Sequence, residues 1–129
     1  MLGSPKDVAR VCQSLLAADD EIDQDKERFY VFHLDSRKAI KLVELISLGT
    51  LDSALIEPRE VFVRAVGERT ASIIISHNHP SGNMEPSEAD LIVTQRLQKA
   101  GEILGIEILD HIIFDKYNHI SFKEKGLIT

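Results

Sequence analysis

The spacing of hydrophobic residues changes several times along the chain, and each change marks a new element. Apolar residues at helical spacing predict helices, and short runs rich in branched and aromatic residues predict strands. In chain order, the pattern predicts a helix at 5–17, strands at 29–34 and 39–47, a helix at 58–66, a strand at 71–77, a helix from 87 to about 104, and strands at 106–114 and 119–122. This order predicts a mixed sheet flanked by helices, in an α/β arrangement that borders on α+β.

The strand predicted at 71–77 is a continuous apolar run, which is typical of a central strand covered on both faces. Pro80 cannot donate to a sheet and therefore ends this strand. The helix that follows is the longest one predicted, and Gly105 is placed to end it. An acidic stretch at 19–26 predicts a loop, and Gly49 and Thr50 open a connection to the helix that begins at Pro58.

Composition narrows the class of protein. The chain has 129 residues, of which 43% are hydrophobic, so we expect one domain with a real core. Its one cysteine, Cys12, excludes a disulfide framework and a four-cysteine zinc site. The net charge of −6 argues against broad, non-specific binding of nucleic acid. With no apolar span and no signal peptide in the sequence, we expect a cytoplasmic protein that does not bind membranes.

The segment between the central strand and the longest helix carries the candidate chemistry. His77 and His79 lie two residues apart at the strand's end, so their side chains point to one face. Seven residues separate His79 from Ser87, which is placed to cap the helix, and Asp90 falls on its first turn. Two imidazoles and one carboxylate can converge there on a tetrahedral metal, with a fourth position open to water, as in catalytic zinc sites.

Simpler interpretations exist for each of these residues. Asp90 can be the acidic member of a capping box with Ser87, which would stabilise the helix by about 1 kcal/mol. His77 and His79 can be strand-end residues bonded to loop backbone. The combination of paired histidines, a strand-ending proline, a cap and an acid favours the metal site, and Ser87 and Asp90 can serve both purposes.

The same residues carry a family resemblance. H-N-H-P followed by P-S-x-x-D matches the JAMM metalloprotease motif, and the strings "GTLDSALIEPREVF", "SHNHPSGNMEPSEADLIVTQRL" and "ILDHIIF" resemble the RadC family of bacterial JAB/MPN domains. Asn78 departs from the serine or threonine usual in the wider motif but matches its RadC-type form. The resemblance runs from about Glu27 to Ile128 and implies a single RadC-type JAB/MPN domain over 1–129. Within it, 1–26 would form an N-terminal helix and acidic loop, and 27–129 a cytidine-deaminase-like three-layer core.

The resemblance also implies a zinc-dependent hydrolase of peptide or isopeptide bonds, with one Zn²⁺ per chain held by His77, His79 and Asp90. Hydrolysis of an amide also needs a proton carrier, and the sequence offers Glu27, Glu44 and Glu60. Family members carry this glutamate at the start of an upstream strand. That placement favours Glu27 as the general base, and the resemblance assigns Ser87 to the developing oxyanion.

Other functions compete with this hydrolase. HNH nucleases disperse their three motif residues over a ββα unit, whereas here they are consecutive. Zinc deaminases need a later P-C-x-x-C, and no cysteine follows Cys12. The stronger alternative is a catalytically silent, metal-stabilised module that binds a partner in DNA repair, because the family name is linked historically to repair. We expect a peptide or protein substrate, and DNA contact only through helical regions that this chain is too short to hold.

Four further residues carry lesser predictions. His111 is expected to be a core histidine bonded to backbone rather than a fourth ligand. His33 has no neighbour of ligand type at useful spacing, Cys12 is expected in the core, and Gly82 is expected to supply a positive φ angle in the loop after His79.

Overall fold

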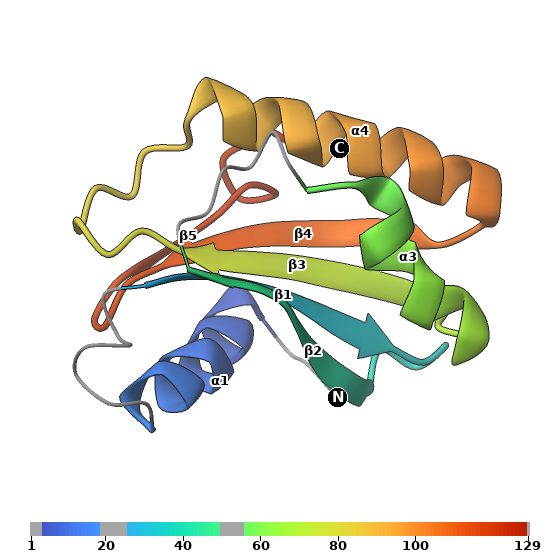
Figure 1. Cartoon of the computed structure of the whole chain (residues 1–129), viewed down its shortest axis with the longest axis horizontal. Coiled ribbons are helices and arrows are strands. Elements are labelled where there is room, and N and C mark those ends of the chain that lie inside the picture. Colours follow the sequence, from blue (N-terminus) through green and yellow to red (C-terminus); the bar gives the residue numbers. More distant parts are fainter. Residues whose placement is uncertain (1–3, 19–25, 50–55, 129) are drawn as a thin grey trace.

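The structure is a computed structural model that describes residues 4–18, 26–49 and 56–128, with only the backbone described at 47–49 (Figure 1). The elements follow the predicted order: α1 (Pro5–Ala17), β1 (Glu27–Leu34), β2 (Ile40–Gly49), α3 (Pro58–Gly67), β3 (Ser72–Asn78), α4 (Glu88–Leu104), β4 (Glu107–Phe114) and β5 (His119–Ser121). The predicted loop at 19–26 and the connection from Gly49 to Pro58 fall mostly outside the described residues.

One mixed sheet forms the middle layer of the molecule. Its strand order is β2-β1-β3-β4-β5, with β3 and β4 parallel and the other neighbours antiparallel. Figure 1 shows α3 and α4 on one face of the sheet and α1 on the other. The predicted α/β class is therefore confirmed, as three layers. No described helix has the length and apolar character needed to cross a bilayer.

Alternation along the strands builds two separate cores. On β1, Phe29 and Val31 face α3 and α4, whereas Tyr30 and Phe32 face α1. Every residue of β3 is buried, which confirms the prediction of a central strand covered on both faces. Cys12 on α1 is buried in the second core, also as predicted.

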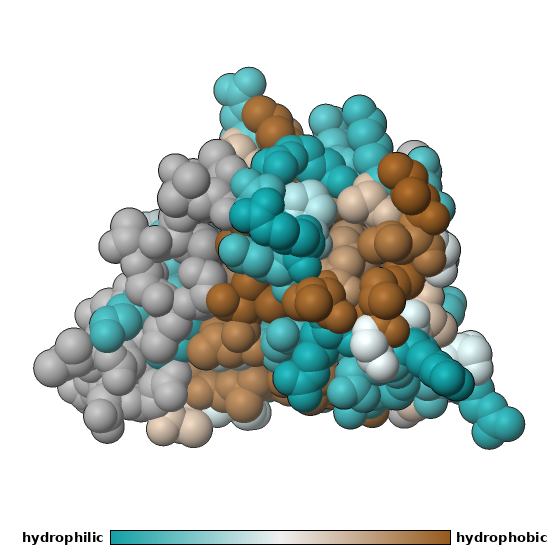
Figure 2. Space-filling model, turned by 45° about the vertical axis from the view of Figure 1, so that its right-hand side comes forward, coloured by the Kyte–Doolittle hydropathy of each residue, from teal (hydrophilic) through white to brown (hydrophobic). Residues whose placement is uncertain are grey.

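The surface of the α3 side is not uniformly polar. Figure 2 shows apolar surface between polar patches on the face that comes forward when the right-hand side of Figure 1 is turned to the front. The exposed apolar side chains among the described residues include Val63 and Val66 of α3.

A β-bulge in β4 changes which residues face α4. Ile73 pairs with Ile108, but the next residue of β3, Ile74, pairs with Asp110, so β4 carries one extra residue at this point. As a result Ile108 and His111 both face the α4 layer, although strict alternation would put them on opposite faces. Asp110 accepts the backbone N–H of His111 at 2.7 Å and so satisfies the donor that the bulge displaces.

Candidate metal centre

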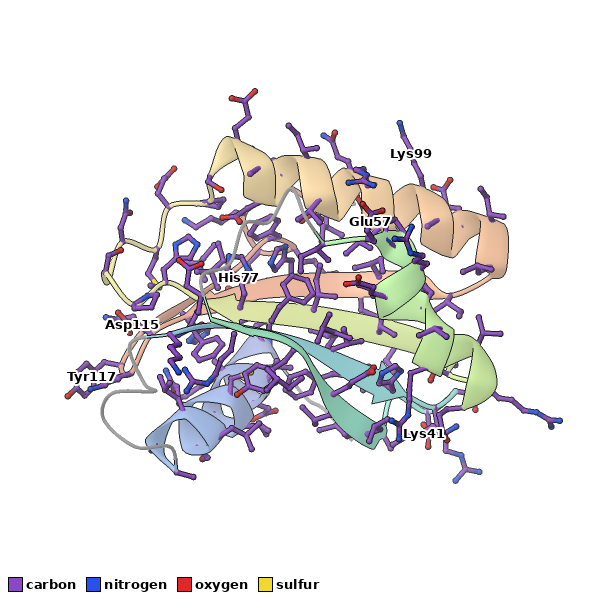
Figure 3. All side chains as sticks on the ribbon, viewed as in Figure 1. Lys41, Glu57, His77, Lys99, Asp115 and Tyr117 are labelled. Carbon is purple, nitrogen blue, oxygen red and sulfur yellow. The ribbon has the colours of Figure 1, made fainter. Side chains whose placement is uncertain are left out.

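The site lies where β3 ends and α4 begins. Because α4 is the crossover between the parallel strands β3 and β4, its N-terminus returns to the carboxyl end of β3. Figure 3 shows His77 inside the molecule, between the sheet and α4. The ring of Phe29 stacks on the His77 imidazole, with centroids 6.1 Å apart and planes 12° apart. His77 is 2% exposed, so its ring is held from several sides.

His79 follows the strand and lies nearer to solvent, with 18% of its side chain exposed. Its backbone N–H still donates to Phe114 of β4, which keeps it in line with the sheet. Its Nδ1 lies 2.6 Å from the carbonyl oxygen of Asn83, so this nitrogen carries the proton and Nε2 is left to face the site. Gly82, in the same loop, has φ 83°, as predicted.

Asp90 reaches the site from the first turn of α4. The predicted capping box is present: the Ser87 hydroxyl accepts the Asp90 N–H at 3.0 Å, and Asp90 Oδ2 accepts the Ser87 N–H at 2.9 Å. The carboxylate is 2% exposed. It also lies against both imidazoles, with Oδ1 3.3 Å from His77 Nε2 and Oδ2 3.3 Å from His79 Nε2. Asp90 therefore caps the helix and completes the cluster at once.

The separations within the cluster fit a metal ion. The two Nε2 atoms are 3.0 Å apart, and each lies 3.3 Å from a different oxygen of the Asp90 carboxylate. Ligands at zinc-like bond lengths of about 2.0–2.1 Å in a tetrahedron would lie about 3.3 Å from one another. The group of His77, His79 and Asp90 therefore could bind a metal ion through these atoms.

The electrostatics of the cluster favour a cation. The pKa of His79 is raised above its usual value, chiefly by the hydrogen bond to Asp90, with smaller contributions from the Asn83 carbonyl and the charges of Asp90 and Glu27, and against the effect of burial. The negative charge that stabilises a proton on His79 would equally stabilise a bound cation. His111 differs: burial, and then the neighbouring His77, hold its pKa well below the usual value, so it is neutral.

His111 and Thr94 form a layer behind the candidate ligands. His77 Nδ1 lies 2.7 Å from His111 Nε2, and His111 Nδ1 lies 2.7 Å from the hydroxyl of Thr94. That hydroxyl donates to the main-chain oxygen of Asp90 at 2.7 Å. The prediction that His111 would bond to backbone is therefore wrong, because both its nitrogens contact side chains. The i, i+4 spacing of Asp90 and Thr94 was the signal that could have revealed Thr94.

Glu27 lies at the start of β1, on the same face of the sheet as His77. Phe29 pairs with His77 across the two strands, so the register continued by two residues would put Glu27 opposite His79. Its charge is the smallest of the causes that raise the pKa of His79. The side chain is partly buried.

Asn78, the residue between the two histidines, fixes the backbone on both sides of Glu27. Its Oδ1 accepts the Arg28 N–H at 2.6 Å, and its Nδ2 donates to the Lys26 carbonyl at 3.1 Å. The amide thus continues the ladder between β1 and β3 beyond the last backbone pair. Sequence reasoning treated Asn78 only as a variation in the motif and missed this role.

The other two candidate bases lie elsewhere. Glu44 of β2 is bonded to the buried His33, with Oε1 2.9 Å from Nε2, so His33 does have a partner of ligand type that sequence spacing did not show. Glu60 lies on the first turn of α3, where a negative charge suits the helix dipole. The register sets Glu44 beside Val31, which pairs with Ile75 in the middle of β3, and Glu60 lies on a helix rather than on a strand next to β3.

Comparison with known proteins agrees with this geometry. A family model described as RadC-like JAB domain matches residues 2–127. The chain is 44% identical over 128 residues to a UPF0758 protein of Syntrophomonas wolfei, an alignment that covers 99% of this chain and 54% of the relative. For a UPF0758 protein of Methanosarcina mazei the identity is 40% over 127 residues, covering 98% and 53%. A third, from Pelodictyon phaeoclathratiforme, is 49% identical over 106 residues, covering 82% and 48%.

A three-layer fold with two histidines at a strand end and an aspartate on the following helix defines a domain of the JAB/MPN type. Within that class, the chain belongs to the RadC-like JAB domain family. It spans about half the length of the curated relatives it matches.

Proposed function

We propose that this domain is a zinc-dependent hydrolase of amide bonds, acting on a peptide or an isopeptide linkage. One observation carries the proposal: the Nε2 atoms of His77 and His79 lie 3.0 Å apart, and each lies 3.3 Å from one of the two carboxylate oxygens of Asp90, close to the edge length of about 3.3 Å in a tetrahedral zinc site. Membership of the JAB family supports the choice of chemistry. When bound, zinc supplies a Lewis acid that polarises a carbonyl group and brings the pKa of water towards neutrality.

Glu27 is proposed as the general base. The continued register of β1 and β3 pairs it with His79, the more exposed of the two histidines, where a substrate carbonyl and a water molecule can enter. In that position its carboxylate accepts the proton of the attacking water and delivers it to the departing nitrogen. Asn78 holds the backbone on either side of Glu27, so the base is fixed relative to the ligand strand.

Ser87 is proposed to stabilise the oxyanion. Its hydroxyl oxygen accepts the Asp90 N–H, and within the part of the chain that the structure describes its O–H makes no further hydrogen bond. A hydroxyl can accept and donate at the same time. Ser87 is exposed, so its O–H is available to the negative charge that develops on a substrate oxygen.

Substitution of Glu27 tests the proposal. Peptides prepared from a cell lysate, together with lysine-branched peptides, are incubated with the zinc-loaded chain, and new termini are counted by mass spectrometry. Glu27→Gln is expected to keep its zinc and to lose activity by about 100-fold or more. Glu60→Gln, a rejected candidate on α3, is the matched control and should remain active. Equal cleavage by Glu27→Gln and the wild type would refute the role given to Glu27.

The catalytically silent module remains the alternative function, and the same assay separates the two. A module predicts bound zinc and a zinc-dependent free energy of unfolding, with no cleavage that depends on Glu27. Contact with DNA belongs to the same alternative, through segments that the longer relatives contain beyond the aligned region.

A further inference from the structure

The groups behind the ligands form a closed ring of contacts. From His77, the ring passes through His111 and Thr94 to the main-chain oxygen of Asp90, in three steps of 2.7 Å each. The Asp90 side chain then returns to His77, with Oδ1 3.3 Å from Nε2. The ring links one proposed ligand on β3 to another on α4 by way of β4. All four residues are at most 2% exposed, so water does not compete for these bonds.

Metal binding by His77 would determine which atom carries the hydrogen on His77, His111 and Thr94. A metal bound at Nε2 needs a lone pair there, so the proton of neutral His77 must lie on Nδ1. The nearest acceptor for that proton is His111 Nε2, which must then be unprotonated. His111 therefore carries its proton on Nδ1 and donates it to Thr94. Thr94 accepts this bond because its own hydrogen goes to the Asp90 carbonyl, which can only accept.

Two phenylalanine rings pack against the two imidazoles of this ring of contacts. Phe122 stacks on His111 at 4.3 Å with an interplanar angle of 27°, and Phe29 stacks on His77. The two imidazoles therefore cannot turn to exchange partners without losing this packing. The bulge at Asp110 is what brings His111 into line with His77.

We propose that His111 and Thr94 are positioning residues of the metal centre, which set the tautomer of His77 and orient its Nε2 towards the metal. The inference rests on the proposed function, because it presumes a metal on His77. The Thr94 hydroxyl accepts the His111 Nδ1–H and donates to the Asp90 carbonyl. Without this hydroxyl, the buried His111 Nδ1–H loses its acceptor. Loss of this hydrogen bond would destabilise the metal-loaded form, since that form requires the proton on His111 Nδ1. Second-layer groups of this kind typically change metal affinity by about 10–100-fold.

Zinc affinity of threonine variants tests the inference. Thr94→Val keeps the shape of the side chain and removes the hydroxyl, so we expect the zinc Kd to rise by about 10–100-fold, measured by competition with a fluorescent chelator. Thr94→Ser restores the hydroxyl and should return the Kd to near the wild-type value. Thr70→Val is the matched control, since Thr70 makes the same kind of buried contact, 3.1 Å from His33 Nδ1, away from the centre.

A second measurement needs no variant. In the zinc-loaded wild type, long-range ¹⁵N–¹H correlation spectra should show His77 and His111 both protonated at Nδ1. A proton on His111 Nε2, or a Thr94→Val Kd equal to that of the wild type, would overturn the inference while the proposed function stands. A wild-type chain that takes up no zinc would overturn both.

Discussion

Asp90 shows how one carboxylate can serve the helix and the site together. Its Oδ2 accepts the Ser87 N–H of the capping box, and this bond fixes the side-chain torsions before any ligand arrives. Its Oδ1 then points at His77 Nε2 at 3.3 Å. Capping of the helix by Asp90 is therefore compatible with a role as a metal ligand, because different oxygens of one carboxylate make the two contacts.

The two roles of this turn can be separated by substitution. Ser87→Ala removes the side-chain cap and should lower the free energy of unfolding by about 1 kcal/mol, measured by urea titration with EDTA present, while zinc content is unchanged. Asp90→Asn keeps an oxygen that accepts the Ser87 N–H, so it should cost less stability but should lose zinc. Loss of zinc in Ser87→Ala to the same extent as in Asp90→Asn would show that helix capping and metal binding cannot be separated at this turn.

At the scale of residues, local pattern decided what the sequence could predict. The capping box, His77, His79 and Asp90 lie within fourteen positions of one another and were found from spacing alone. Thr94 follows Asp90 at i, i+4 on the same helix and could have been found in this way, whereas His111 contacts His77 from β4, an element that no spacing rule connects to these residues. The partnership of His33 with Glu44 was missed for the same reason, since it joins neighbouring strands.

At the scale of elements, the hairpin between β1 and β2 depends on Asp35. Its Oδ1 accepts the N–H of Arg37 at 2.8 Å and of Ala39 at 3.0 Å, and Lys38 adopts a positive φ of 62° between them. These bonds, that to Ala39 foremost, lower the pKa of the Asp35 carboxyl below its usual value. The turn is therefore stabilised by the ionised form of this side chain.

This shift predicts a dependence of stability on pH. Because the pKa in the folded chain lies below the unfolded value of about 3.9, the stabilisation is present above that pH and is lost as the pH falls through the folded pKa. Asp35→Asn keeps an acceptor oxygen but cannot ionise. The difference in free energy of unfolding between wild type and Asp35→Asn should therefore shrink between pH 5 and 3. A difference that stays constant over this range would contradict the assignment.

The order and type of the elements were predictable from hydrophobic period, and their ends shifted by up to two residues. β1, for instance, begins at Glu27 rather than Phe29, because pairing with Gly49 of β2 extends it. The bulge in β4 was not predictable, because it arises from the pairing of β4 with β3. That single extra residue decides whether His111 faces His77, so the contact between these two histidines could not be predicted from the sequence.

At the scale of the whole molecule, topology explains why the site lies where it does. A parallel pair of strands with a crossover helix brings the carboxyl end of β3 to the N-terminus of α4, and the two elements supply all three proposed ligands. The antiparallel neighbour β1 carries Glu27, the proposed general base, at the same end of the sheet. Three elements must fold together to complete the centre, so a metal that binds there should also stabilise the assembled domain.

Metal content is the most direct test of the account. The wild type, dialysed against zinc and then against buffer, should hold about one zinc per chain by elemental analysis. His119→Ala, which removes a histidine from β5 outside the cluster, should hold as much, whereas His77→Ala and Asp90→Ala should hold far less. Equal zinc in all four proteins would contradict the assignment of these side chains as ligands.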